Sequence, residues 1–319
     1  MRVFIAGATG VLGRALIRQL VARGHAVVGL ARGEQGAQTI ESLGGQSRRA
    51  DIFDADALAR AAEGAQVVIH AATAIPTKAR PKARDWDMND RLRRDGTRAL
   101  VSCAAKINAG LYLQQSIVWL ARPSDGAFFD ETAEPLLDDP ITLSAFDAET
   151  IAFEAGERCG FNAAVLRCGL FYGPDSAHTR MMGQMLLKRR LPIIGRGDSG
   201  LSCLHTDDAA GAFVAAAEGN RKGLWHVVDN QPVMVKEMLM SFAEKLGAPP
   251  PRHVPAWLAR LFAGANTVNF FTSSIRTSNA RFREDFGWSP RFPVYKEGLE
   301  QVVQTWKDEG FGVKANQPR

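Results

Sequence analysis

Short apolar runs alternate with helical stretches over the first 170 residues of the chain. The runs are rich in β-branched residues and predict strands at Arg2–Ala6, Ala26–Ala31, Gln46–Ala50, Gln66–Ala71, Leu111–Gln115 and Asn162–Arg167. This alternation indicates βαβ units, whose right-handed crossovers place helices on both faces of a parallel sheet. We therefore expect an α/β fold with a doubly wound parallel sheet of the Rossmann type.

The pattern changes after about residue 170. Glycine and proline become frequent in YGPDSAH and LPIIGRGDSG, and GAPPPRHVP predicts a rigid connector between two helical pieces. The prediction is a dinucleotide-binding domain over residues 1–170, with its sheet completed by later segments. Residues 171–319 are expected to form mainly a smaller α/β substrate lobe over the carboxyl edge of the sheet, where ligands of such folds bind.

Composition restricts the class of protein more than its activity. Hydrophobic residues make up 46% of the 319 residues, and the longest apolar runs are far shorter than the ~20 residues of a membrane-spanning helix. The four cysteines lack C-x-x-C spacing and are expected to be reduced, mostly buried thiols without a metal. No charged-then-apolar leader precedes the first strand, so we expect a cytoplasmic protein with no membrane partner.

Charge is nearly balanced along the chain. The 39 basic and 34 acidic residues give a net charge of +5. The basic tract from Lys78 to Arg98 is interleaved with aspartates and lacks the stacking aromatics of a nucleic-acid surface. We expect this tract to be a solvated helix face and expect no nucleic-acid partner.

A glycine turn, GATGVLGRAL, follows the first strand and opens a helix predicted over Val11–Arg23. Gly7 can turn the chain sharply, Gly10 lets backbone amides approach a pyrophosphate, and Gly13 lets the helix lie against the strand. The helix dipole favours the phosphate charge. The predicted cofactor-binding residues of this turn are Gly7, Thr9, Gly10, Val11, Leu12 and Gly13.

The spacing of these glycines resembles the short-chain dehydrogenase/reductase superfamily, in the extended and atypical branches that include the NAD-dependent epimerase/dehydratases. Five further segments occur in the family order: RRADIFD, VVIHAAT, VLRCGLFYGPD, CLHTDDAAGAF and REDFGWSPRFPVYKEGLEQVV. The resemblance implies cofactor contacts at Asp51, Ile52, Ala71, Ala72, Thr73, Cys168 and Leu170. A homodimer through a helix pair that includes the helix of Phe146 is a further expectation from the resemblance.

The end of the second strand bears on the choice of cofactor. It reads GLARG, with Arg32 and no acidic residue before Glu34. A carboxylate here would bind the ribose 2′-hydroxyl of NAD, whereas a 2′-phosphate needs a cation, and a guanidinium pairs with phosphate bidentately. NADP is the predicted cofactor, with NAD and a merely solvated Arg32 as the alternatives.

The resemblance also implies a Tyr-x-x-x-Lys pair that carries proton chemistry on one helix. In the register set by Glu154, Phe146 occupies the tyrosine position and Thr150 the lysine position. The three tyrosines are followed four residues later by Ser116, Ser176 and Leu299, and no lysine lies between Lys106 and Lys188. A phenyl ring cannot exchange protons, so any acid or base must come from elsewhere.

Three residues are candidates for a replacement catalytic group. Gln115, with Ser116 beside it, occupies the position of the family hydroxyl that orients the substrate oxygen. His178 lies in a predicted loop near the substrate lobe, and a histidine in a cleft can act as acid or base near neutral pH. The alternative for Ser116 is an inert serine at the sheet end.

Other polar residues nearby have structural interpretations. Asp147 and Glu149 lie beside Phe146, at the tyrosine position, and are expected to be solvated helix residues. Asp208 is expected to cap a helix, and His205 matches a family position that is usually structural. Arg93 replaces a family asparagine three residues before Gly96, which indicates an altered centre.

Two functions remain open. The favoured hypothesis is an oxidoreductase or epimerase-like enzyme acting on an unidentified carbonyl, hydroxyl or sugar-nucleotide-like small molecule, with its proton taken from water or a non-family residue. The alternative is a non-catalytic NADP-binding sensor or regulatory protein, since the fold by itself does not determine the function.

Overall fold

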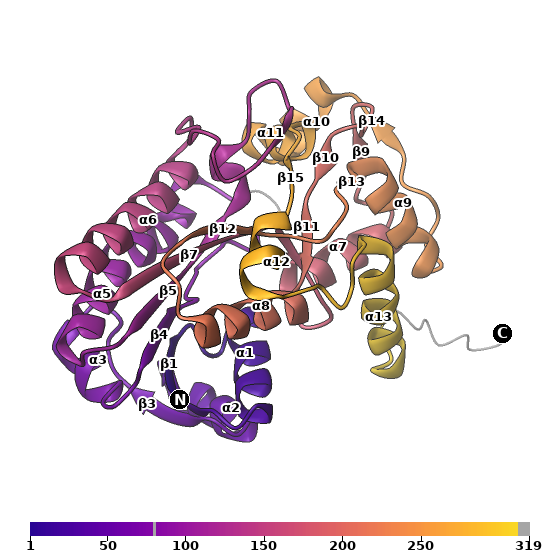
Figure 1. Cartoon of the computed structure of the whole chain (residues 1–319). Coiled ribbons are helices and arrows are strands. Elements are labelled where there is room, and N and C mark those ends of the chain that lie inside the picture. Colours follow the sequence, from indigo (N-terminus) through magenta and orange to yellow (C-terminus); the bar gives the residue numbers. More distant parts are fainter. Residues whose placement is uncertain (79–80, 312–319) are drawn as a thin grey trace.

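Parallel strands form a seven-stranded central sheet in the computed structural model, which describes residues 1–78 and 81–311 (Figure 1). In spatial order the strands are β12 (Gly223–Val227), β7 (Asn162–Cys168), β5 (Leu111–Ile117), β4 (Val67–His70), β1 (Arg2–Ala6), β2 (Ala26–Ala31) and β3 (Gln46–Arg49). The order changes direction between β1 and β4, the point where doubly wound sheets bind ligands. The predicted Rossmann sheet is confirmed.

All the predicted strands are present, with shifts at their ends. β5 continues past Gln115 to Ile117, so Ser116 lies inside the sheet. The predicted ends at Ala50, Gln66 and Ala71 lie outside the strands. β12 comes from the later part of the chain, beyond the predicted set.

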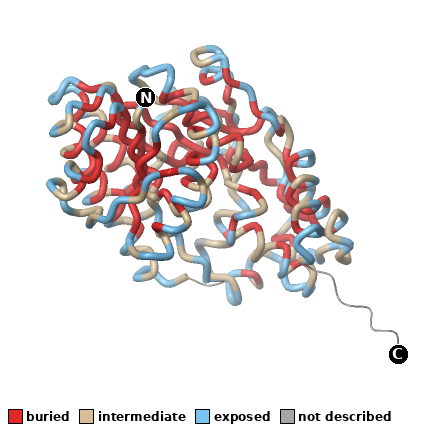
Figure 2. The backbone as a smooth tube through the Cα atoms, turned by 90° about the horizontal axis from the view of Figure 1, so that it is seen from below, coloured by how far each residue is buried: buried red, intermediate tan, exposed pale blue. Residues whose placement is uncertain are grey.

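Helices cover both faces of the sheet. On one face lie α1 (Val11–Ala22), α2 (Glu34–Ser42) and α8 (Thr206–Gly219), and on the other lie α3 (Ala55–Ala61), α5 (Thr97–Lys106) and α6 (Pro140–Cys159). Figure 2 shows the buried residues gathered in the interior of the molecule and the exposed residues on its outer turns. Because both faces are covered, the inner strands β1, β2 and β4 read as nearly continuous apolar runs. α1 ends at Ala22, with Arg23 as its C-cap.

A smaller lobe follows β7 and has its own apolar core, which includes Phe242, Leu299 and Trp306. Its helices are α7 (Ala177–Leu187), α9 (Val235–Lys245), α10 (Ala256–Ala263), α11 (Ala265–Thr272) and α13 (Tyr295–Asp308), and α12 (Ala280–Phe286) packs beside β12. Its short strands are β8 (Leu170–Tyr172), β9 (Ile193–Ile194), β10 (Gly200–Leu201), β11 (Cys203–His205), β13 (Val233–Met234), β14 (His253–Val254) and β15 (Arg276–Thr277), with β6 (Phe128–Phe129) paired to β15. The proline-rich segment links α9 to α10, as predicted.

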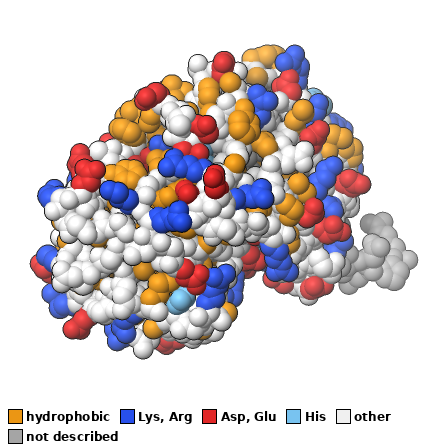
Figure 3. All heavy atoms as spheres, in the orientation of Figure 1, with side chains coloured by type: hydrophobic (Ala, Val, Ile, Leu, Met, Phe, Trp, Pro, Cys, Tyr) orange, Lys and Arg blue, Asp and Glu red, His pale blue; other side chains and the backbone are white. Residues whose placement is uncertain are grey.

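The basic tract, which includes the short helix α4 (Asp87–Arg91), is solvated only in part. Arg91 and Arg98 are exposed and pair with Asp95. Arg93 is 7% exposed and donates from Nη1 to the Ile141 carbonyl at 2.8 Å, so the prediction of a solvated face is wrong at this residue. The face drawn in Figure 3 carries basic and acidic side chains interspersed.

The composition also led to expectations about the cysteines and about membrane-spanning helices, which the structure tests. Cys103, Cys168 and Cys203 are buried and Cys159 is exposed, which confirms that most of the thiols lie inside the protein. None of the helices in residues 1–78 and 81–311 has the length and apolar character needed to cross a bilayer.

A carboxyl group is buried where the sheet meets the lobe. Asp229 is 1% exposed, Tyr172 Oη donates to its Oδ2 at 3.2 Å, and its Oδ1 has no partner among the described residues. Burial, together with the nearby Asp208 carboxylate, raises the pKa of Asp229 to about 8. The folded protein therefore holds a proton at Asp229 that the unfolded chain releases near its ordinary value of 3.8.

We predict that this proton makes stability depend on pH. Because the pKa of Asp229 is higher in the folded protein than in the unfolded chain, its contribution to stability is complete at a pH below the unfolded pKa and is lost as pH rises through the folded pKa. The free energy of unfolding should therefore fall as pH rises from about 4 to about 8, by up to about 1.4 kcal/mol per pH unit. Asp229→Asn cannot ionise and should lose this part of the slope. Urea unfolding at about pH 5, 6.5 and 8 measures it. Asp198→Asn, at an exposed position, is the control, and equal slopes for wild type and Asp229→Asn would contradict the prediction.

Candidate cofactor and active site

The turn between β1 and α1 has two positions where only glycine fits. Gly7 has a φ of +90°, and a Cβ there would lie 2.5 Å from the backbone of Ala71. A Cβ on Gly13 would lie 2.2 Å from the Gly7 carbonyl oxygen. Any side chain would force these segments apart. The two glycines therefore let the turn, α1 and the end of β4 approach one another closely.

The start of α1 suits a phosphate group. Its N-cap is Gly10, and no side chain caps the first turn. The N–H groups of Val11, Leu12 and Gly13 have no carbonyl acceptor within the helix, because its first hydrogen bond runs from the Arg14 amide to the Gly10 carbonyl. They lie at the positive end of the helix dipole. A dinucleotide pyrophosphate fits such a cradle, and these three amides are the groups that would hold it.

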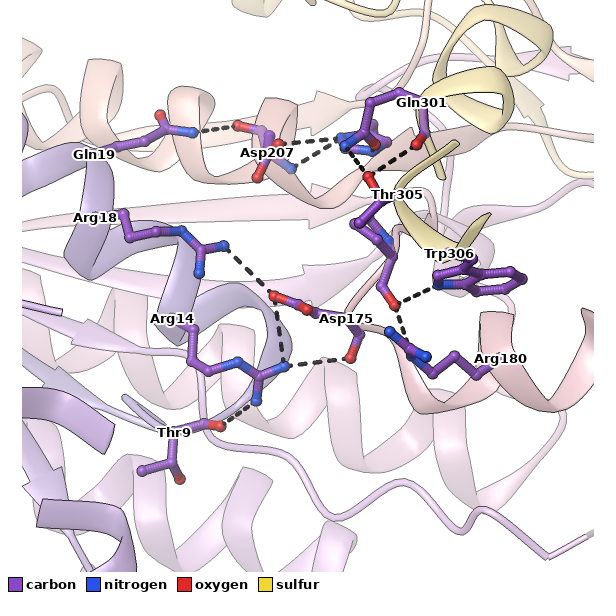
Figure 4. Close-up of polar contacts among 12 residues, drawn as sticks. Thr9, Arg14, Arg18, Gln19, Asp175, Arg180, Asp207, Gln301, Thr305 and Trp306 are labelled. Carbon is purple, nitrogen blue, oxygen red and sulfur yellow. Dashed lines mark hydrogen bonds and ion pairs between the residues drawn. The ribbon is translucent and has the colours of Figure 1, made fainter. Parts of the chain in front are cut away.

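Arg14 fixes the turn in place and links it to the lobe (Figure 4). Its Nη1 donates to the Thr9 carbonyl at 2.8 Å, and its Nη2 donates to the Asp175 carbonyl at 3.3 Å. From the other side, Trp306 of α13 donates from Nε1 to the Pro174 carbonyl at 2.9 Å. The segment after β8 is thus held between the first turn of α1 and the lobe.

The residues predicted to contact the adenosine half lie past the ends of β2 and β3. Arg32 is exposed and makes no ion pair within residues 1–78 and 81–311. Asp51 is exposed and its Oδ1 accepts from the Phe53 amide at 3.0 Å, while Ile52 is half-buried against the apolar layer under α3 and α5. The structure therefore brings all three to the carboxyl edge of the sheet.

The other predicted cofactor contacts follow β4 and β7. Ala71 is buried beside Gly7, Ala72 is half-buried and Thr73 is exposed. Leu170 is half-buried in β8. Cys168 is 1% exposed within the apolar core under α1 and α8, so its thiol packs inside the protein.

α6 positions the two residues at the Tyr and Lys places. The helix begins after Asp139, whose Oδ1 accepts from the amides of Ile141 and Thr142 at 2.7 and 3.0 Å. Phe146 is half-buried and packs in the apolar cluster of Ile117 and Leu120, at the end of β5. Thr150, one turn later, is also half-buried.

Glu149 is buried, and the prediction of a solvated residue was wrong. It is 3% exposed and accepts two hydrogen bonds from Arg167 of β7, from Nε at 2.9 Å and from Nη2 at 2.7 Å. This bidentate geometry is the strong form of a guanidinium–carboxylate contact. Its neighbour Asp147 does lie at the surface, where it pairs with Arg94.

Ser116 belongs to the same buried group. Its hydroxyl donates to Glu149 Oε1 at 2.5 Å, and its side chain is 4% exposed. A serine has one hydrogen to donate, and a carboxylate can only accept. In this arrangement Ser116 presents only lone pairs to any other group, so it does not donate to a substrate oxygen as the family hydroxyl is implied to do.

The remaining catalytic candidates have other partners or neighbours. Gln115 is half-buried near the end of β5. His178 lies in the first turn of α7 rather than in a loop, and its Nε2 is 3.2 Å from the Pro76 carbonyl oxygen. The prediction that Asp208 caps a helix was wrong, because its carboxylate accepts from the amides of Arg291 and Phe292 at 2.7 and 3.0 Å.

The cap of α8 is His205, whose Nδ1 accepts from the Asp207 amide at 3.2 Å. Its ring is fully buried and packs against Tyr172 and Phe292. These contacts give His205 a structural role, as its family position implies.

The three tyrosines are unsuited to proton transfer. Tyr112, Tyr172 and Tyr295 are each at most 4% exposed. Burial raises the pKa of all three above the ordinary value for a phenol. None of them lies on α6, so the geometry supplies no tyrosine at the position where the family places its acid.

A family model described as the NAD dependent epimerase/dehydratase family matches residues 3–227. The chain belongs to this family. A curated relative, the 3-diazoavenalumate denitrifying reductase of a Streptomyces species, is 35% identical over 308 residues, which cover 94% of this chain and 99% of the relative. The 2-alkyl-3-oxoalkanoate reductase of Shewanella oneidensis is 28% identical over 280 residues, which cover 80% of this chain and 69% of that protein.

Solved structures support the same fold for this epimerase/dehydratase-family member. Human epimerase family protein SDR39U1 with NADPH has a TM-score of 0.80 at 20% identity, and the match covers 95% of this chain and 99% of that one. This likeness shows the fold of the chain. The matching family model is itself described as NAD dependent, and the curated relatives of this chain include reductases.

Sequence reasoning missed the buried group of Ser116, Glu149 and Arg167. A signal was present, because Arg167 interrupts the otherwise apolar strand NAAVLRC. A charged side chain inside a buried strand requires a partner of opposite charge nearby. The sequence could not show which carboxylate supplies it, since α6 and β7 meet only in the folded protein.

We predict that Glu149→Ala destabilises the protein by about 3–5 kcal/mol, because it leaves the Arg167 guanidinium buried without its partner. Asp147→Ala on the same helix removes a half-buried pair with Arg94 at the surface and should cost less, about 1 kcal/mol. Urea unfolding of both variants measures the difference. If Glu149→Ala does not fold, Glu149→Gln, which keeps one acceptor, should show an intermediate loss. Equal effects at both positions would contradict the geometry.

Proposed function

We propose that this protein is an NADP-dependent reductase whose hydride acceptor needs no proton from the protein, and that its substrates are diazo compounds that react as diazonium cations. The observation that carries the proposal is the hydrogen bond from Ser116 to Glu149, which commits the only hydroxyl hydrogen of this serine. Phe146 and Thr150 complete a centre without a tyrosine or a lysine on α6.

This centre is poorly suited to carbonyl reduction. A carbonyl that accepts hydride becomes an alkoxide, and protonation by a positioned acid commonly contributes 10² to 10⁴-fold. When bound, NADPH supplies a hydride, so a diazonium carbon exchanges its C–N bond for a C–H bond, N₂ leaves, and no net proton is consumed. The residues present need only bind the acceptor and hold it in position.

Charge at the centre also favours a diazonium group. A lysine ammonium would repel a cationic substrate, and Thr150 is neutral. The half-buried ring of Phe146 offers a π face, which attracts cations. Ser116 presents lone pairs, which likewise suit a positively charged group.

The relatives support a reductase. The protein matched over nearly its whole length is named as a denitrifying reductase of a diazo compound. The Shewanella relative is named for a 3-oxoalkanoate substrate, so carbonyl reduction with water as the acid is the second candidate. Both names denote enzymes, which gives the alternative of a non-catalytic sensor no support.

NADP is proposed rather than NAD because Arg32 is the first charged residue after β2 and is exposed without an ion pair in the described part of the chain. A guanidinium can pair bidentately with a 2′-phosphate. The cofactor-binding set proposed is the one predicted from the sequence, with Cys168 contributing only through its backbone.

The two candidate reactions differ in their proton balance. With benzenediazonium as the probe, we expect the purified protein to release about one N₂ per NADPH oxidised with no proton uptake, whereas carbonyl reduction takes up one proton per NADPH. NADPH absorbance, N₂ release and an indicator dye in weak buffer measure the three quantities. The rate without protein is subtracted. Turnover confined to carbonyl compounds, with proton uptake, would overturn the diazo proposal in favour of the second candidate.

A variant with the family pair restored tests the charge argument. We predict that Phe146→Tyr combined with Thr150→Lys lowers kcat/KM for benzenediazonium by roughly tenfold, about 1.4 kcal/mol, because the ammonium repels the substrate. Thr150→Met is the matched control, because methionine is similar in length to lysine but carries no charge, and it should change kcat/KM by less than about threefold. An unchanged value in the double variant would show that charge at this position does not select the substrate.

A further inference from the structure

The register of β2 and β3 brings a second arginine beside Arg32. Arg49 lies opposite Ala31, the residue before Arg32. Paired residues of parallel strands point to the same face, and Ala31 packs in the core under α1 and α2. Arg49 therefore points toward α2, where its Nη2 forms an ion pair with Glu34 in the first turn.

This corner also lies next to the glycine turn. A Cβ added to Gly36, in the first turn of α2, would lie 3.3 Å from Thr9 Cγ2. The first turn of α2 thus packs against the loop that starts α1. The group of Arg32, Glu34 and Arg49 consequently lies beside the cradle assigned to the dinucleotide.

Glu34 is the first carboxylate after β2, and a free carboxylate near this point would favour NAD by accepting the ribose 2′-hydroxyl. It would also repel a 2′-phosphate. In the structure Glu34 is engaged by Arg49, and the three side chains together carry one net positive charge. We propose that Arg49 sets the selectivity for NADP over NAD, by holding Glu34 away from the ribose and by adding a second guanidinium for the 2′-phosphate.

The inference rests on the proposed use of NADP and can be tested without disturbing the fold. The side chains of Arg49 and Glu34 are 58% and 71% exposed, and exposed pairs contribute little to stability. Arg48 provides a matched control. It lies opposite Leu30, points to the other face of the strand, and among the described residues its side chain donates to the Ser47 carbonyl alone.

The measurement is calorimetric binding of NADP⁺, NAD⁺ and 2′,5′-ADP to wild type and to single variants. We expect Arg49→Gln to lower the ratio of NADP⁺ to NAD⁺ affinity by roughly tenfold or more, since one charge-assisted contact is lost and Glu34 is released. Glu34→Gln added to Arg49→Gln should restore part of that ratio. Arg48→Gln should change it by less than about threefold, although it removes the same charge.

Equal losses in Arg48→Gln and Arg49→Gln would overturn the inference, since they would indicate a general electrostatic field. Tighter binding of NAD⁺ than NADP⁺ by wild type would also overturn it. Neither result depends on turnover, so the reductase proposal is judged separately by its own assay. Conversely, a protein that reduces no diazo probe but shows the expected shift would leave the selectivity inference standing.

Discussion

A guanidinium inside a parallel sheet has to be neutralised, and in this protein that requirement organises the candidate active site. Arg167 lies on the middle of three neighbouring strands, opposite Ser116 on β5 and His226 on β12. Its partner, Glu149, lies on α6 and accepts both of its hydrogen bonds. Burying either charge alone would cost several kcal/mol, so the pair fixes how α6 is rotated against the sheet.

That rotation has chemical consequences. It places Phe146 in the apolar cluster at the end of β5 and leaves Thr150 half-buried one turn later. It also gives Ser116 a carboxylate acceptor and so removes the hydrogen that the serine could offer to a substrate. A single buried contact therefore connects the packing of a helix with the polarity of the site. The absence of the Tyr-x-x-x-Lys pair and the hydrogen bond from Ser116 to Glu149 have the same effect, because each removes a group that could donate a proton to a substrate.

The cofactor end of the site depends on steric rather than electrostatic limits. Gly7 and Gly13 leave no room for a Cβ, and this closeness lets the turn, α1 and β4 converge. Arg14 then ties the turn to the segment after β8, which α13 holds from the other side. Arg18, one turn later on α1, also pairs with Asp175, so two arginines of this helix join the glycine turn to the smaller lobe.

The features that could be predicted from the sequence are those that depend on residues close to one another along the chain. Apolar runs and glycine spacing determined the sheet, its strand positions and the glycine turn, because those features arise from local conformation and from the periodicity of burial. Five ordered segments were enough to indicate the family. The positions of Phe146 and Thr150 followed from the same register, and their side chains do lie on α6.

The tertiary structure decided which polar groups meet. Glu149 reads as a surface helix residue, and only the packing of α6 on β7 buries it against Arg167. Asp208 reads as a helix cap, yet its carboxylate binds amides from a segment far along the chain while His205 caps α8. Arg49 comes beside Arg32 only through strand pairing. The sequence by itself determined local geometry and burial, whereas hydrogen-bond partners and charge pairing were set by contacts between distant segments, which no local pattern encodes.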